Sequence, residues 1–107
     1  MKSLILLLVL IPVSYLATCS VMSYRINSKF ESIEVGNSHA DVLKVMGVPS
    51  SIEKPNKLYK RFASSPCAGD CSLRLWYENR LDIDIEAWSF EFDSNDLVIE
   101  KTHWLSP

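Results

Sequence analysis

Residues 33–49 read IEVGNSHADVLKVMGVP, and this stretch specifies a short helix together with both of its ends. Ser38 is a favourable N-cap, and Asp41 follows three residues later as the second half of a capping-box-like pair. Gly47 is expected to end the helix, and Pro49 prevents it from resuming. The pattern predicts an amphipathic helix of about nine residues. Its apolar face holds Val42, Leu43 and Met46, and Phe30 and Ile33 are expected in a shorter turn before it.

Downstream of this helix the hydrophobic period changes from helical spacing to alternation. Residues 73–77 (LRLWY), 81–85 (LDIDI) and 88–92 (WSFEF) each place apolar side chains at every second position, as expected for half-buried strands. The turn-forming run DSND at 93–96 separates the third of these from a last strand over 97–104, which begins with the apolar residues 97–99. Residues 88–92 and 97–104 are therefore predicted to form a β-hairpin.

A helix followed by a separate run of strands indicates the α+β class, with an N-terminal helix or helix pair packed on a three- to four-stranded antiparallel sheet. The length of 107 residues suits one small domain. A hydrophobic content of 48% with three glycines excludes collagen-like and fully disordered chains. The net charge of −2 gives no reason to expect a nucleic acid as partner.

The N-terminus has the composition of a secretory signal. Lys2 precedes an unbroken apolar run over residues 4–11, which continues more weakly after Pro12. The run is short for a membrane-spanning helix, which needs about 20 apolar residues. We therefore predict a signal peptide over residues 1–18, a flexible tether over 19–29 and a folded domain over 30–107.

The end of this signal, LATC at residues 16–19, resembles the lipobox of bacterial lipoproteins, with Thr18 in place of the usual glycine or alanine. The resemblance implies that Cys19 is lipidated and that the chain is cut before it. Multiple acyl chains anchor a protein stably without a spanning helix. Ser20 after the cysteine implies sorting to the outer membrane. An uncleaved anchor and ordinary secretion are the alternatives.

Two further cysteines, Cys67 and Cys71, are separated by Ala-Gly-Asp. In an exported protein such a close pair predicts a disulfide, and glycine and aspartate favour the turn that it requires. Free thiols are one alternative. A metal or redox site is the other, but the histidines have no ligand spacing to this pair and the redox motif needs two intervening residues.

Catalytic motifs, phosphate loops and metal-ligand spacings are not found in the sequence, so no enzyme activity and no cofactor are predicted. The acidic residues Asp82, Asp84 and Glu86 are interpreted as a solvated strand face, with acid–base or cation chemistry as the alternative. His39 and His103 are interpreted as surface residues, and the three tryptophans as core. Four cations are interpreted either as a solvated loop or as contacts with anionic lipid or an acidic partner: Lys54, Lys57, Lys60 and Arg61.

The helix motif, with the later Trp76-Tyr77 and the aromatic strand over 88–92, resembles the SmpA/OmlA (BamE-like) family of small outer-membrane lipoproteins. The resemblance implies an α-α-β-β-β layout, shared with β-lactamase-inhibitor-like domains. It also implies a lipid-anchored periplasmic domain that binds an envelope protein in outer-membrane assembly or envelope maintenance, with no small-molecule substrate. The alternative function is an inhibitor-type module that blocks an enzyme.

Overall fold

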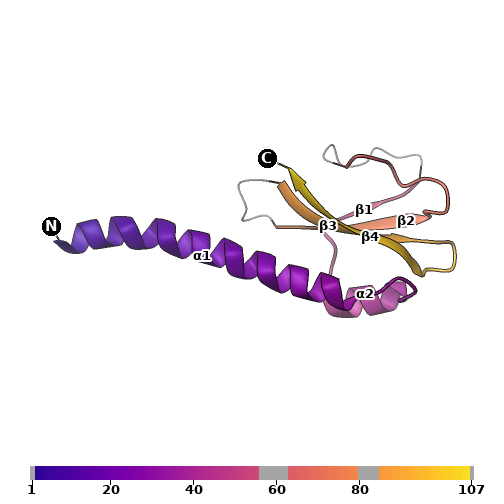
Figure 1. Cartoon of the computed structure of the whole chain (residues 1–107), viewed down its shortest axis with the longest axis horizontal. Coiled ribbons are helices and arrows are strands. Elements are labelled where there is room, and N and C mark those ends of the chain that lie inside the picture. Colours follow the sequence, from indigo (N-terminus) through magenta and orange to yellow (C-terminus); the bar gives the residue numbers. More distant parts are fainter. Residues whose placement is uncertain (1, 56–62, 80–84, 107) are drawn as a thin grey trace.

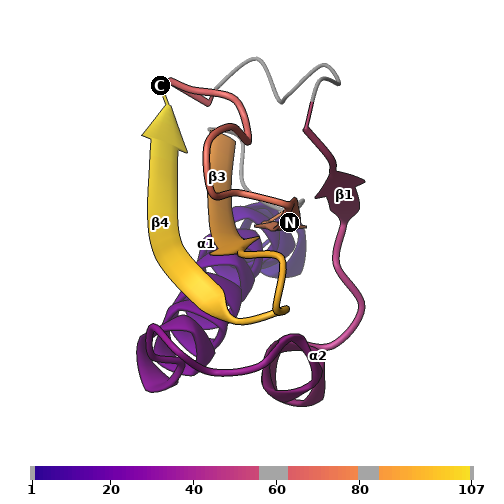
Figure 2. The ribbon, with the colours of Figure 1, turned by 90° about the vertical axis from the view of Figure 1, so that its right-hand side faces the viewer.

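A computed structural model describes residues 2–55, 63–79 and 85–106 of the chain. Two helices are followed by four strands, and the helices lie on one side of the sheet (Figures 1 and 2). The elements are α1 (Lys2–Ser32), α2 (His39–Met46), β1 (Ser51–Glu53), β2 (Leu73–Glu78), β3 (Ile85–Phe92) and β4 (Val98–Ser106). The sheet is antiparallel in the order β1-β2-β3-β4. The predicted α+β class is therefore confirmed.

Helix α2 has the ends that its sequence predicts. The Ser38 Oγ accepts a hydrogen bond from the Asp41 amide, and the Asp41 carboxylate accepts one from the Ser38 amide, each at 3.1 Å. Gly47 has a φ of +84°, a conformation that a side chain would strain, and its amide donates to the Leu43 carbonyl at 2.9 Å. The helix is eight residues long.

The buried face of α2 is narrower than predicted. Val42 is fully buried and Met46 packs against the core, but Leu43 is 40% exposed. A helix this short meets the sheet along one line of residues, so the side chain one position further round the helix remains in contact with water. Leu43, predicted on the same apolar face as Val42 and Met46, therefore lies at the edge of that face and not in the core.

The β3–β4 hairpin is the longest paired unit of the sheet and confirms the predicted hairpin. It is closed by the predicted turn, in which one Asp93 carboxylate oxygen accepts hydrogen bonds from the amides of Asn95 and Leu97. The register places Trp88 opposite His103 and Glu91 opposite Glu100, with an irregularity at Glu91/Phe92. β4 begins against the loop before α2, since Val98 exchanges two backbone hydrogen bonds of 2.8 Å with residues 36–37.

The main core lies between the sheet and the two helices. Leu75 and Tyr77 of β2 and Phe90 of β3 point towards the helices, in agreement with the predicted alternation. Phe30 and Ile33, at and just beyond the end of α1, complete this core and are 5% and 2% exposed. Burial of apolar area at about 25 cal/mol per Å² makes this face the main source of stability.

The opposite face of the sheet carries a second, smaller cluster. It contains Ala63, Trp76 and Ala87, with Trp104 packed against them. The Trp76 and Trp104 ring centroids lie 5.6 Å apart, and the Trp104 indole donates to the Ser89 hydroxyl at 2.8 Å. Trp76 and Trp88 are therefore fully buried, as predicted, but on two different faces of the sheet, whereas Trp104 is only partly buried.

Candidate functional site

Helix α1 consists of two parts with opposite surroundings. Its most apolar 18-residue window has a mean hydropathy of 2.4 and no buried residue, and the helix projects beyond the sheet, so the molecule measures 62 × 26 × 17 Å (Figure 1). By length and composition this helix is able to cross a membrane, and a signal sequence near an N-terminus has the same character. The C-terminal part of α1, in contrast, packs on the sheet.

Polar contacts hold this C-terminal part of α1 against the β3–β4 hairpin. The Ser23 hydroxyl donates to Glu86 Oε2 at 3.0 Å, and the Trp88 indole donates to Asn27 Oδ1 at 3.2 Å. The Lys101 ammonium donates to the Phe30 carbonyl at 3.1 Å and lies over the Phe30 ring. These contacts fix the C-terminal part of α1 to the folded domain. The apolar N-terminal part continues the same helix without a break.

The flexible tether predicted over residues 19–29 is therefore not observed, and these residues are helical. The reason is tertiary. Ser23, Asn27 and Phe30 recur at spacings of four and three residues, and each meets a partner on the sheet. Because two of the three are polar, the pattern does not resemble an amphipathic helix when the sequence is read alone.

Glu86 is the centre of the docking contacts, and its interpretation as a solvated residue is wrong. Its side chain is 7% exposed and accepts from Ser23, from Asn79 at 3.3 Å and from the His103 ring at 3.0 Å. The His103 ring also stacks on Trp88 with centroids 4.8 Å apart. Asp82 and Asp84, the other predicted members of the acidic face, lie outside the described residues.

Cys19 lies on α1 one helical turn before Ser23 and is half-buried. It borders a cavity of about 480 Å³ together with Tyr24, Asn27 and His103. The predicted lipidation position is therefore next to the docking contacts, and an acyl group attached there would begin close to the domain. Lipidation itself stays a prediction.

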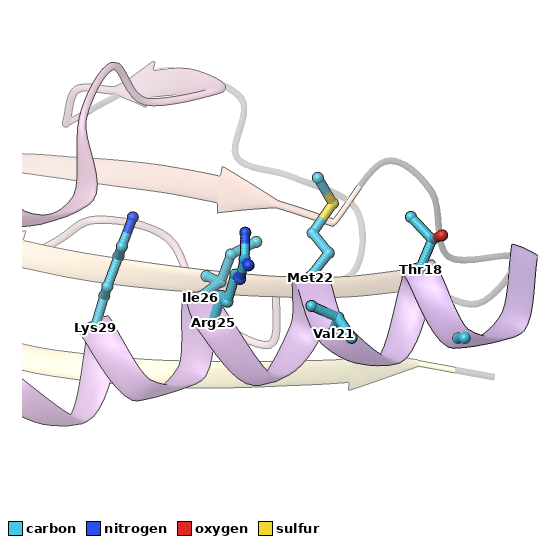
Figure 3. A pocket seen from close by; sticks show the side chains of 7 residues that line it. Thr18, Val21, Met22, Arg25, Ile26 and Lys29 are labelled. Carbon is cyan, nitrogen blue, oxygen red and sulfur yellow. The ribbon is translucent and has the colours of Figure 1, made fainter. Parts of the chain in front are cut away.

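A second cavity, also of about 480 Å³, follows a different side of α1 and is called the α1 groove below. Figure 3 shows its side chains along the helix, with Thr18, Val21 and Met22 towards the N-terminal end and the cations Arg25 and Lys29, together with Ile26, towards the other. The lining residues are Ala17, Thr18, Val21, Met22, Arg25, Ile26 and Lys29. No motif in the sequence indicates this groove, because its residues become neighbours only when the predicted tether is helical.

The predicted disulfide between Cys67 and Cys71 is formed, with Cα atoms 5.3 Å apart. Both cysteines are buried, whereas Pro66 and residues 68–70 are exposed. The bridge therefore closes a small loop that displays its tip to solvent. Next to it lies a cavity of about 550 Å³, which this loop shares with the β3–β4 turn.

A buried carboxylate that sequence reasoning missed fixes this loop to the sheet. Glu53 at the end of β1 accepts hydrogen bonds from Arg74 at 2.8 and 3.1 Å, from the Trp76 indole at 2.9 Å and from the Cys67 amide at 2.9 Å. Arg74 also donates to the Ser65 carbonyl at 2.7 Å. Burial alone raises the pKa of Glu53, but these donors outweigh it and hold the pKa below its ordinary value.

Glu91 lies beside the same arginine but has the opposite electrostatic surroundings. Burial, and then the neighbouring Glu100, raise the pKa of Glu91 to about 7, against the smaller lowering effect of Arg74 at 3.6 Å. A buried ion pair and a closely spaced pair of acidic side chains therefore lie side by side on the face of the sheet away from the helices.

The remaining residues singled out from the sequence are four cations that follow β1 and the histidine His39. Lys54 is exposed beyond β1, and Lys57, Lys60 and Arg61 lie outside the described residues. His39, predicted at the surface, is half-buried with its ring centroid 4.9 Å from that of Phe92. Within the described part of the chain, no group of three or more metal-ligating side chains is found.

Comparison with known proteins gives no relative: no family model, no curated protein and no solved structure matches the chain.

Proposed function

We propose that this chain is a membrane-anchored, non-enzymatic domain of the bacterial envelope that binds a protein partner. The single observation that carries the proposal is helix α1, which continues without a break from an exposed apolar half into a half docked on the sheet. Such a helix leaves a large apolar surface in water unless a membrane covers it. The docked half then holds the domain at the membrane surface.

The anchor that we propose is a lipid on Cys19, with the domain facing the periplasm from the outer membrane. The lipobox-like residues 16–19 and the Cys67–Cys71 disulfide support it, because a disulfide in a small domain is typical of an oxidising compartment. The apolar half of α1 would bring the precursor to the membrane, and after cleavage before Cys19 the lipid would replace it as the anchor. The docking contacts of Ser23 and Asn27 would remain in the mature chain. The lipid would then lie about one helical turn, or about 6 Å, from the domain.

A binding role is favoured over a catalytic one by the use of the buried polar groups. In the described residues, the buried carboxylates of Glu53 and Glu86 bind arginine, histidine and other donors of the domain itself. Exposed apolar side chains lie instead near the edge strand β1, where Val48 is 91% and Ile52 is 59% exposed. Such residues beside an open strand edge are suited to contact with a protein partner.

Metabolic labelling with an alkyne-tagged palmitate tests the anchor. The wild-type chain should incorporate the label and sediment with outer membranes, and the Cys19→Ala variant should lose the label. A Cys71→Ser variant serves as control, because it removes a different cysteine. Equal labelling of wild type and Cys19→Ala, or no labelling of either, would remove the lipoprotein proposal.

Affinity capture from detergent-solubilised envelopes tests the partner. The wild-type chain should retain an envelope protein, and Val48→Asp with Ile52→Asp should release it because charges then face the apolar contact. Glu34→Gln, an exposed change away from β1, is the control. Retention of the same protein by both variants would show that this edge is not the contact surface.

The second candidate, an inhibitor-type module, is favoured by the disulfide loop. A rigid loop that displays Pro66 and residues 68–70 suits insertion into an enzyme cleft, because its entropy loss on binding is small. In that case capture should yield a soluble enzyme, and substitution of Asp70 rather than Val48 should release it.

A further inference from the structure

We propose that the α1 groove is a binding site for one anionic phospholipid, with its acyl chains along the apolar end and its phosphate at Arg25 and Lys29. The inference deepens the proposed membrane function and rests on it. Five of the seven lining residues follow Cys19, so most of the site would also be present in a chain cleaved there. The volume of about 480 Å³ lies within the range of about 300–1,000 Å³ typical of small-ligand sites.

The order of side chains along the groove matches the order of groups in a bilayer leaflet. The end formed by Ala17, Val21 and Met22 is mainly apolar, since the Thr18 hydroxyl there donates to the Ser14 carbonyl, and Arg25 and Lys29 follow towards the domain. At 1.5 Å per residue, the groove extends for about 18 Å along the helix axis. The apolar end lies next to Cys19, the proposed lipid position, and in an uncleaved chain it also continues the exposed apolar half of α1. In either form the apolar end faces the membrane, so a lipid of the surrounding leaflet would enter the groove with its acyl chains at that end.

The charge of the groove selects the kind of head group. Arg25 and Lys29 are exposed, and within the described part of the chain neither has an ion-pair partner. This contrasts with Lys101 on β4, which lies 3.9 Å from Glu31 and donates to a backbone carbonyl. Two unpaired cations one helical turn apart can hold one phosphate between them. A zwitterionic head group would bring a third positive charge next to Arg25 and Lys29, so it should bind more weakly than an anionic one.

The docking contacts keep the groove in a fixed shape. Ile26, in the middle of the groove, also packs against the core, and Asn27 next to it accepts the Trp88 hydrogen bond. The helix that carries the site is therefore held to the sheet from Ser23 onward, which includes the end of the groove with both cations. A rigid groove loses little entropy when a lipid binds, whereas the predicted flexible tether would have had to order itself first.

Native mass spectrometry of the full chain carrying Cys19→Ala tests the site. The chain is released from nanodiscs of phosphatidylcholine and phosphatidylglycerol in equal amounts, and the retained lipids are identified. We expect retention of one phosphatidylglycerol in preference to phosphatidylcholine. Arg25→Gln with Lys29→Gln should lower that preference by about fivefold for each charge removed. Lys44→Gln, which removes an exposed cation of α2 outside the groove, should leave it unchanged.

A second variant separates a groove from a general attraction of cations to an anionic surface. Met22→Trp fills the apolar end and leaves both cations in place, so it should also abolish retention. Val13→Trp, at an exposed position of α1 outside the groove, is the matched control. Circular dichroism confirms that each variant keeps its helix and sheet content.

Three results would overturn the site: no preference in the starting chain, an unchanged preference in Met22→Trp, or an equal loss in the control variants. Failure of the membrane function is recognised separately, because the chain would then be recovered from the soluble fraction of cells whatever lipid it retains in nanodiscs.

Discussion

The two faces of the sheet are stabilised by different physics. The face towards the helices is covered by aromatic and aliphatic side chains, among them Phe90, whose ring centroid lies 5.4 Å from that of Phe30 and 5.9 Å from that of Tyr77. The opposite face has a buried arginine, Arg74, held between carboxylates and stacked over the Trp76 ring at 5.0 Å. Apolar burial needs no specific partner, whereas each buried charge requires one.

This difference explains how each face contributes. The helix face supplies stability and positions α1 next to the proposed membrane. The opposite face positions the disulfide loop, because Glu53 and Arg74 bind backbone groups at Cys67 and Ser65. A buried ion pair contributes little net stability compared with apolar side chains of the same size, but the loss of one partner is strongly destabilising. Four sets of variants test this contrast.

The largest effect is expected on the helix face. Phe90→Ala removes a fully buried ring from the centre of the core and should lower the free energy of unfolding by about 4 kcal/mol. Denaturant unfolding of the detergent-solubilised chain, followed by tryptophan fluorescence, measures it. Leu105→Ala, at a 70% exposed position of the same hairpin, should change stability by less than about 0.5 kcal/mol. Similar losses in both variants would show that this core is not the main source of stability.

On the opposite face, Glu53→Ala should lower the free energy of unfolding by about 3 kcal/mol, because it leaves the buried Arg74 with one distant carboxylate. Simultaneous replacement, Glu53→Met with Arg74→Met, removes both charges and should recover a large part of that loss. The same unfolding measurement compares the two variants. A double variant less stable than Glu53→Ala would contradict this, because the ion pair would then contribute net stability and the loss would not come from leaving Arg74 unpaired.

The disulfide should have a smaller effect. Cys67→Ser with Cys71→Ser opens a loop of few residues and should lower the free energy of unfolding by about 2 kcal/mol. Reduction of the wild-type chain should reproduce that value, and a reductant should leave the variant unchanged. If reduction has no effect on the wild type, the bridge orders the loop without stabilising the fold.

The smallest effect is expected at Glu91 and depends on pH. The pKa of its carboxyl is raised to about 7 in the folded chain, so between its ordinary value near 4.5 and pH 7 the folded state binds more protons than the unfolded state. The free energy of unfolding should therefore fall as the pH rises through this window. Glu91→Gln removes this dependence and should stabilise the chain at pH 8 by about 1 kcal/mol.

Thermal melts of wild type and Glu91→Gln from pH 5 to 8 measure this difference. Glu34→Gln, at an exposed position, is the control and should keep the wild-type pH profile. A wild-type melting temperature that rises between pH 5 and 7 would contradict the assignment of the shifted carboxyl.

Sequence reasoning was most successful where the controlling interactions are local. The capping box of Ser38 and Asp41, the end of α2 at Gly47 and the β3–β4 turn all depend on residues within a few positions of one another. The disulfide was predictable for the same reason, since its cysteines are four residues apart. Sequence reasoning failed at Glu86 and at residues 19–29, where hydrogen bonds join positions about 60 residues apart in the chain.

The sequence by itself determined that an amphipathic helix is followed by antiparallel strands and that the last two strands form a β-hairpin. It could do so because hydrophobic period, helix caps and turns are local properties of the chain. The tertiary structure alone decided that α1 continues to Ser32 and docks, that Glu53 and Arg74 form a buried pair, and that the α1 groove exists. Polar residues such as Ser23, Asn27 and Glu53 have no preferred place in a local pattern. Their positions are set by partners that only the folded chain brings within hydrogen-bonding distance.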